Sequence, residues 1–245
     1  MMDRIGLEEN FIRVVNKEGK ASFGGNQNWF ADVKWHNIHG QGCGLIAAVD
    51  TYLYLSNHRS ISKEDYLNII NDYLSKRFVM KLFLHEFSFL KNKSIAIGIV
   101  PRQIVRFLRK KLKKEARGYK FKWNGRHGTR KMYEKMKSML EKNVPVVWGL
   151  YSSGKFLKLY KFNHIKNQFV DNYLLLTDGK MGHNTTNSHY VTATAIIETP
   201  TATKHQRMVE ISSWGDRFYI DFDEYLAYVG NSKISKYCSN ILILR

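Results

Sequence analysis

Apolar residues recur at helical spacing through the first 142 residues of the chain. Helical stripes are predicted at Ile46, Val49 and Leu53; at Tyr66, Ile69, Ile70, Tyr73 and Leu74; at Ile104, Val105, Leu108 and Leu112; and at Met132, Met136, Met139 and Leu140. Ser62 followed by Asp65 resembles a capping pattern, and Pro101 suits a first helical turn. Residues 78–90 are apolar with an ambiguous period, and we expect a short helix there.

From Val144 onward the pattern changes to runs rich in β-branched and aromatic residues, which are typical of strands. Strands are predicted at 144–151, 155–162, 168–176, 189–197, 207–213, 217–221 and 240–244. Helices therefore precede strands instead of alternating with them. This segregation predicts an α+β fold in which a helical layer packs on an antiparallel sheet.

No internal repeat or low-complexity linker divides the chain, so we expect a single domain, 1–245, with two lobes. Residues 1–36 show no sustained period and are expected to wrap over the body of the protein. Their docking residues would be Phe23, Trp29, Phe30 and Trp35. Residues 37–142 would form the helical lobe and residues 143–245 the sheet lobe.

The composition favours a folded protein of a reducing compartment. Apolar residues make up 44% of the chain, and the only cysteines are Cys43 and Cys238, so no disulfide framework is implied. No secretory signal pattern opens the chain, and no window approaches the apolar length of a membrane span. We therefore expect a soluble, cytoplasmic protein.

Positive charge is concentrated in one stretch of the chain. Residues 102–137 hold 15 Lys or Arg against two acids, so they contribute +13 of the net charge of +18. Such a stretch attracts nucleic acid, anionic lipid or an acidic partner, but it is also common on solvated helix faces. No zinc-finger spacing, RNA-binding aromatic motif or recognisable helix-turn-helix accompanies it.

Cys43 is the candidate nucleophile of the chain. It lies between Gly42 and Gly44 where the first helix is predicted to begin. Unpaired backbone N–H groups and the helix dipole favour a thiolate there, so we expect a lowered pKa for this thiol. The two glycines would let a substrate carbonyl or other backbone approach the sulfur. The alternative is a buried structural cysteine.

Among nine histidines, His189 is the candidate base for this thiol, because it stands at the entry of the predicted strand YVTATAII. If the strand MVEISSWG pairs antiparallel with it, Ser212, Ser213 and Trp214 return beside His189. The Ser212 hydroxyl would then orient the imidazole, and the Trp214 indole would cover that bond. The alternative is an ordinary histidine at a strand end.

Four motifs together resemble the papain-like cysteine peptidase superfamily, and within it the domain of the bacteriocin-processing, double-glycine peptidases. They are GQGCGLIAA, VPVVWGLY, SHYVTATAI and EISSWGDRFYIDFDEYL, in an order that spans roughly residues 35–230. The resemblance implies a papain-like fold, with the cysteine helix in an N-terminal helical lobe packed on a C-terminal antiparallel sheet lobe.

The resemblance also implies roles for four residues. Cys43 would be the nucleophile, His189 the base and Ser212 the group that orients the imidazole, where the family has Asn or Asp. The family's oxyanion donor is a Gln six residues before the cysteine, and Asn37 occupies that position here. Gln41 lies too near the cysteine to match that spacing but is a further residue that would line the site, and Glu210 or Asp216 are alternatives to Ser212.

These observations predict a thiol hydrolase, a cysteine peptidase or amidase, acting on a peptide or related amide. Two alternatives remain: an acyltransferase that uses the same thiol, and a catalytically inactive scaffold that binds nucleic acid or an acidic partner through residues 102–137. No cofactor is expected. A metal site built from Cys43, His36 and His39 is disfavoured, because no second cysteine or carboxylate stands at ligand spacing.

Overall fold

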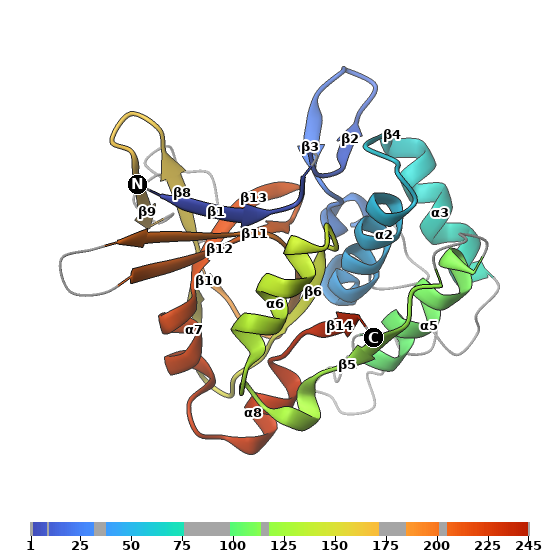
Figure 1. The fold of residues 1–245 in the computed structure, drawn as a ribbon. Helices are drawn as coiled ribbons and strands as arrows, with labels where there is room; N and C mark the ends of the chain where they lie inside the picture. Colours follow the sequence, from blue (N-terminus) through green and yellow to red (C-terminus); the bar gives the residue numbers. More distant parts are fainter. Residues whose placement is uncertain are drawn as a thin grey trace, which may run out of the picture.

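The computed structural model describes residues 2–8, 10–31, 38–75, 99–113, 118–171, 185–200 and 205–244. Within these residues the chain has a mixed α+β fold, as the segregation of helical and strand patterns predicts (Figure 1). Every strand pair of the main sheet is antiparallel, which also agrees with the prediction.

The main sheet has seven strands within the described residues, in the order β1-β11-β12-β13-β8-β9, with β6 also paired to β11. Its strands are β1 (Asp3–Gly6), β6 (Val146–Leu150), β8 (Tyr160–Asn163), β9 (Gln168–Asp171), β11 (His189–Pro200), β12 (His205–Ser213) and β13 (Asp216–Asp221). Strand β6 pairs with the first half of β11 and β1 with the second half. The long strand β11 is therefore central to the sheet.

Three small sheets flank the main one. The first joins β2 (Arg13–Val15), β3 (Ala21–Phe23) and β4 (Ser60–Ser62); the second joins β5 (Phe121–Trp123) and β14 (Leu242–Leu244); the third joins β7 (Leu157–Lys158) and β10 (Thr185–Thr186). In two of the three sheets, residues far apart in sequence are joined, so the ends of the chain are held against its middle.

The helices include all four that the apolar stripes predict. They are α1 (Ile38–Gln41), α2 (Cys43–Leu55), α3 (Lys63–Ser75), α5 (Pro101–Leu112), α6 (Met132–Glu141), α7 (Phe222–Val229) and α8 (Lys233–Cys238), with short 3-10 turns η1 (Gln27–Phe30) and η2 (Gly125–His127). Ser62 caps α3 as predicted, accepting a bond from the Asp65 backbone N–H. Figure 1 shows α3 and α5 beside α2, which itself packs against β11.

Helix α2 is the core helix of the protein. It packs against β11, β6, α3 and α5, and 11 of its 13 residues are buried. A helix that is apolar on all sides belongs inside a protein, since a surface helix keeps one polar face. The start of α2, where Cys43 lies, is thereby fixed against the beginning of β11.

Several expectations from the sequence differ from the structure. Residues 1–36 supply β1 to the main sheet as well as a wrapping segment, and the second half of the chain contains two helices, α7 and α8, where only strands were predicted. The predicted strand 155–162 is divided into β7 and β8. The predicted helix at 78–90 lies outside the described residues. No helix in the described part of the chain has the length and apolarity to cross a membrane.

Candidate functional site

Cys43 is the first residue of α2, as the glycine-flanked motif predicts. Both neighbouring glycines are closely packed. A Cβ on Gly42 would lie 2.3 Å from the Ile38 side chain, and a Cβ on Gly44 would lie 3.1 Å from the Tyr190 ring. The absence of side chains at these positions lets α1 turn directly into α2 and lets α2 approach β11.

The pKa of the Cys43 thiol is raised above its ordinary value, so the expectation of a lowered pKa is wrong for this structure. Burial is the largest cause, because it removes the water that would solvate a thiolate. The backbone N–H groups of Tyr190, Gly44 and Cys43 act in the predicted direction and lower the pKa, but by less. The amide donors at the helix start are therefore present, and desolvation outweighs them.

His189 is the first residue of β11, and its side chain is buried among polar and aromatic neighbours. Its Nε2 atom forms a 2.7 Å hydrogen bond with Ser213 Oγ. The Trp214 indole stacks on the imidazole, with 4.2 Å between ring centroids and an angle of 6° between planes. Ser213 thus holds one edge of the imidazole ring, and Trp214 covers one face. The covering role of Trp214 is the one that the sequence predicts.

Ser213 makes the hydrogen bond to His189, whereas the sequence analysis assigned it to Ser212. The Ser212 hydroxyl donates a 2.7 Å hydrogen bond to the Phe23 carbonyl oxygen. The strand register explains the difference, because Ser212 lies opposite Thr192 on β11. Neighbouring residues of a strand point to opposite faces, so Ser213 shares the face of His189 and Ser212 does not.

One small cavity brings the site residues together. It is lined by Gln27, Cys43, Ile46, Ala47, Asp50, His189, Tyr190, Thr192, Ser212, Ser213 and Trp214. Its open volume of about 10 Å³ holds at most about one water molecule. The sulfur also receives the N–H of Tyr190, the residue after His189. Cys43, which is partly exposed, and His189 therefore line the same small cavity.

Gln27 is a site residue that the sequence analysis missed. It lies in η1 and lines the cavity, and its Nε2 donates a 2.7 Å hydrogen bond to the His39 carbonyl oxygen. Its buried Oε1 has no partner among the described residues. Asn37, the predicted oxyanion donor, lies outside the described residues. Gln27 stands 16 residues before Cys43, so a search by spacing alone does not find it.

Asp50 places a carboxylate at the edge of the same cavity, two helical turns after Cys43. It is 1% exposed and accepts hydrogen bonds from the Gly25 backbone N–H and from the Tyr66 hydroxyl at 2.8 Å. Burial raises the pKa of Asp50 to about 7, and its two donors oppose that rise. The carboxyl group thus ties α2 to the segment that carries Gln27.

Other candidate features of the site are more limited. Among the described residues, no group of three His, Cys, Asp or Glu side chains could hold a metal ion. His36 lies outside the described residues. Gln41 lies in α1 and is not among the residues that line the cavity. Glu210 and Asp216, the alternatives to Ser212, form ion pairs elsewhere on the sheet.

The basic stretch folds as the amphipathic pattern predicts. The cationic residues of α5 that were predicted to point away from its buried stripe, Arg102, Arg106, Arg109 and Lys113, are exposed. Partial burial and the charges of Lys122 and Lys131 lower the pKa of Lys135. Lys122 of β5 and Lys131, just before α6, therefore lie close enough to Lys135 for their charges to act on it.

No protein-family model, curated protein or solved structure shows a match to this chain. The class of site is thus defined by its own geometry: a cysteine at a helix start that shares a small cavity with an oriented histidine.

Proposed function

We propose that this protein is a papain-like thiol hydrolase that cleaves a peptide or related amide. The observation that carries the proposal is that Cys43 and His189 line one small cavity. The thiol lies at the start of α2 with backbone N–H groups directed at it, and the imidazole is oriented by Ser213 and covered by Trp214. A nucleophile, a base and a group that orients the base are the parts that acyl transfer to a thiol requires.

The reaction would proceed by the following steps. The Cys43 proton passes to His189 as the sulfur attacks the substrate carbonyl carbon, and the Cys43 backbone N–H stabilises the resulting oxyanion. Collapse of this intermediate breaks the C–N bond, and the amine leaves with the proton from His189. Water then attacks the thioester, with His189 as its base, and releases the acid and the free thiol.

Burial of Cys43 makes His189 essential to this proposal. Desolvation alone favours the neutral thiol, so the sulfur becomes nucleophilic only when the imidazole takes its proton. The Ser213 bond at Nε2 holds the imidazole in one orientation for this transfer. The two free thiols also fit our expectation of a reducing, cytoplasmic setting.

The test is the rate at which iodoacetamide alkylates each cysteine, followed by peptide mass spectrometry. At about pH 6 to 7 we expect Cys43 to react faster than Cys238, whose pKa is also raised by burial. His189→Ala and Ser213→Ala should each slow alkylation of Cys43 by about tenfold or more, since both disturb the proton acceptor. Ser212→Ala is the matched control.

Ser212→Ala should change the alkylation rate by less than about twofold, while it lowers the free energy of unfolding by about 1 to 2 kcal/mol through the unpaired Phe23 carbonyl. Slow alkylation of Cys43 that rises only in alkaline solution and ignores His189→Ala would refute the hydrolase. A thioester that forms with a model peptide ester but yields only amine adducts would identify an acyltransferase instead.

We also propose that the cationic surface of α5, β5 and the start of α6 binds nucleic acid. The proximity of Lys122, Lys131 and Lys135 supports this, because neighbouring cations attract a polyanion. The exposed cations of α5 add positive charge next to β5, since α5 packs against that strand.

A further inference from the structure

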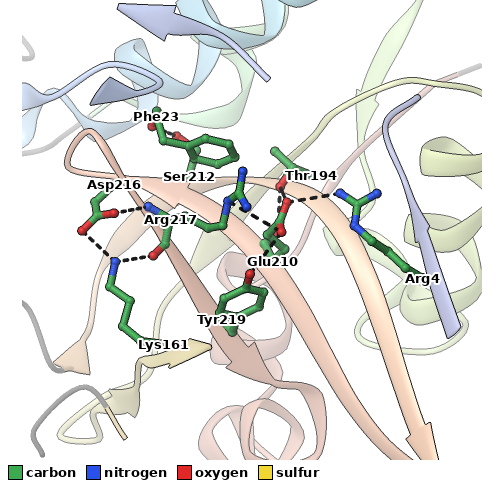
Figure 2. Close-up of polar contacts among 9 residues, drawn as sticks. All are labelled: Arg4, Phe23, Lys161, Thr194, Glu210, Ser212, Asp216, Arg217 and Tyr219. Carbon is green, nitrogen blue, oxygen red and sulfur yellow. Dashed lines mark hydrogen bonds and ion pairs between the residues drawn. The ribbon is translucent and has the colours of Figure 1, made fainter. Parts of the chain in front are cut away.

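Glu210 lies at the centre of a polar cluster on the main sheet that the thiol chemistry does not use (Figure 2). Its side chain is 4% exposed, and its carboxylate accepts a 2.8 Å hydrogen bond from Thr194 and a 3.3 Å bond from Tyr219. Arg4 and Arg217 approach it from opposite sides, at 3.5 and 3.7 Å. These neighbours fix the carboxylate in one position.

The β-bulge in β11 builds this cluster. Ala193 lies opposite Ile211 and Ala195 opposite Glu210, so Thr194 is an extra residue in the strand. A bulge re-aims the side chain of its extra residue. Here it directs the Thr194 hydroxyl to Glu210, and the Thr194 carbonyl accepts the N–H of Leu7 beside β1.

A cavity of about 290 Å³ opens over this cluster. Its wall is mostly polar, and it is lined by Arg4, Leu7, Glu8, Asn10, Phe11, Phe23, Thr194, Glu210 and Arg217. This volume is at the lower end of the range for small-molecule sites. The cavity is separate from the one at Cys43, although Phe23 and Ser212 form a bonded wall between the two.

Two guanidinium groups supply the hydrogen-bond donors that an anion in this cavity would need. Glu210 opposes the two guanidinium groups, and both of its ion pairs are at the long end of the accepted range. Each guanidinium has five N–H donors, so many remain for a ligand. The other acid in the wall, Glu8, accepts a bond from Asn143 through its carboxylate. The wall therefore holds two guanidinium groups and two carboxylates, and its fit to an anion rests on the remaining N–H donors of Arg4 and Arg217.

Both arginines are held at their places while about half of each side chain remains exposed. The Arg217 guanidinium lies 4.4 Å from the centroid of the Phe23 ring, a cation–π contact. A planar fork that is oriented in advance binds carboxylate or phosphate oxygens in pairs at a small cost in entropy.

We propose that this cavity is a binding site for a small oxyanion, a carboxylate or a phosphate, held between Arg4 and Arg217 above Glu210. The site does not depend on the proposed hydrolase, because none of its four charged residues, Arg4, Glu8, Glu210 and Arg217, takes part in the thiol chemistry. The Thr194 hydroxyl and the Phe23 ring, which also line the cavity, would contact the uncharged part of an organic ligand.

Isothermal titration calorimetry of the full chain with inorganic phosphate and with succinate, at fixed ionic strength, tests this proposal. We expect one of the two anions to bind with a dissociation constant of about 1 mM or lower, and the preferred anion identifies the source of the oxyanion. Arg4→Gln and Arg217→Gln should each weaken binding about tenfold. Arg217→Lys, which keeps the charge but loses the fork, should weaken it less.

Two further variants make the test specific. Arg126→Gln removes the same charge from an exposed position in η2, and it should leave the affinity within about twofold. Glu210→Gln keeps an acceptor for Thr194 but removes the opposing charge, so it should strengthen binding several-fold. No binding of either anion at about 10 mM, or an equal loss of affinity with Arg126→Gln, would overturn the proposal.

Discussion

At the residue scale, the candidate site depends on which of two adjacent serines faces the histidine. Ser212 and Ser213 are chemically identical, and both are buried. Their difference comes only from the register of β11 against β12, which places Ser212 opposite Thr192. A shift of one residue would exchange their roles. The sequence indicates that both serines lie near His189, but only the pairing of β11 with β12 determines which of them faces the imidazole.

Asp50 carries a prediction about pH. The folded protein keeps the Asp50 proton up to about pH 7, whereas the unfolded chain releases it near the ordinary pKa of 3.8. Between these two pH values the folded protein holds a proton that the unfolded chain has released. The contribution of Asp50 to the free energy of unfolding therefore falls as the pH rises from 3.8 to about 7, and it stays constant above about pH 7. The wild type should thus lose stability relative to Asp50→Asn between about pH 5 and 7, on the order of 2 to 3 kcal/mol.

Urea unfolding of both proteins across this pH range measures the difference. Asp3→Asn, which changes an exposed carboxyl group on β1, serves as the control and should show no such trend. A constant difference between wild type and Asp50→Asn at every pH would contradict the raised pKa.

At the scale of elements, the segment after β3 determines how α2 and β12 meet. Gly24 has a φ of +77°, and its N–H donates to the Ile12 carbonyl. A Cβ there would lie 2.3 Å from Ser212 Oγ and 2.5 Å from Asp50 Oδ2. The backbone thus passes between the two elements that carry the site, and no side chain fits at this point.

Gly24→Ala should therefore destabilise the protein by about 3 kcal/mol or more, because it combines a left-handed backbone with steric overlap. Gly19→Ala is a matched control, since Gly19 has a φ of +76° but nothing within 4 Å of an added Cβ. It should cost only about 1 kcal/mol of backbone strain. Similar urea midpoints for the two variants would show that packing at Gly24 is loose.

At the scale of the whole molecule, the exposed cations of α5 contribute little to the stability of the fold. The apolar stripe of α5 enters the core, while its cations remain in solvent. Removing exposed cations should therefore leave the stability within about 0.5 kcal/mol and change only long-range attraction to polyanions.

The variant Arg106→Gln, Arg109→Gln, Lys113→Gln tests this surface by binding to duplex DNA at several salt concentrations. If these three residues neutralise phosphates, the slope of log K against log [salt] should decrease in magnitude by about 2 to 3. The control Arg13→Gln, Lys17→Gln, Lys20→Gln removes the same charge from exposed positions in and beside the β2–β3 hairpin. Equal effects of both variants would mean that net charge, and no particular surface, attracts DNA.

The sequence by itself determined the α+β class, the four helical stripes and the start of α2 at Cys43. These features follow from periodicity and capping, which act over a few residues. It did not predict the contribution of β1 to the main sheet or the helices α7 and α8. These elements are short, and they are stabilised mainly by packing against residues that are distant in sequence.

Only the tertiary structure decided the environment of each functional group. The helix start lowers the pKa of any thiol, but the depth at which α2 lies under β11 made burial the larger effect on Cys43. The pairing of β11 with β12 placed Ser213, and not Ser212, beside His189. One extra residue in β11 also placed Thr194 next to Glu210. Desolvation and strand register depend on residues that are far apart in the chain, so no local pattern specifies them.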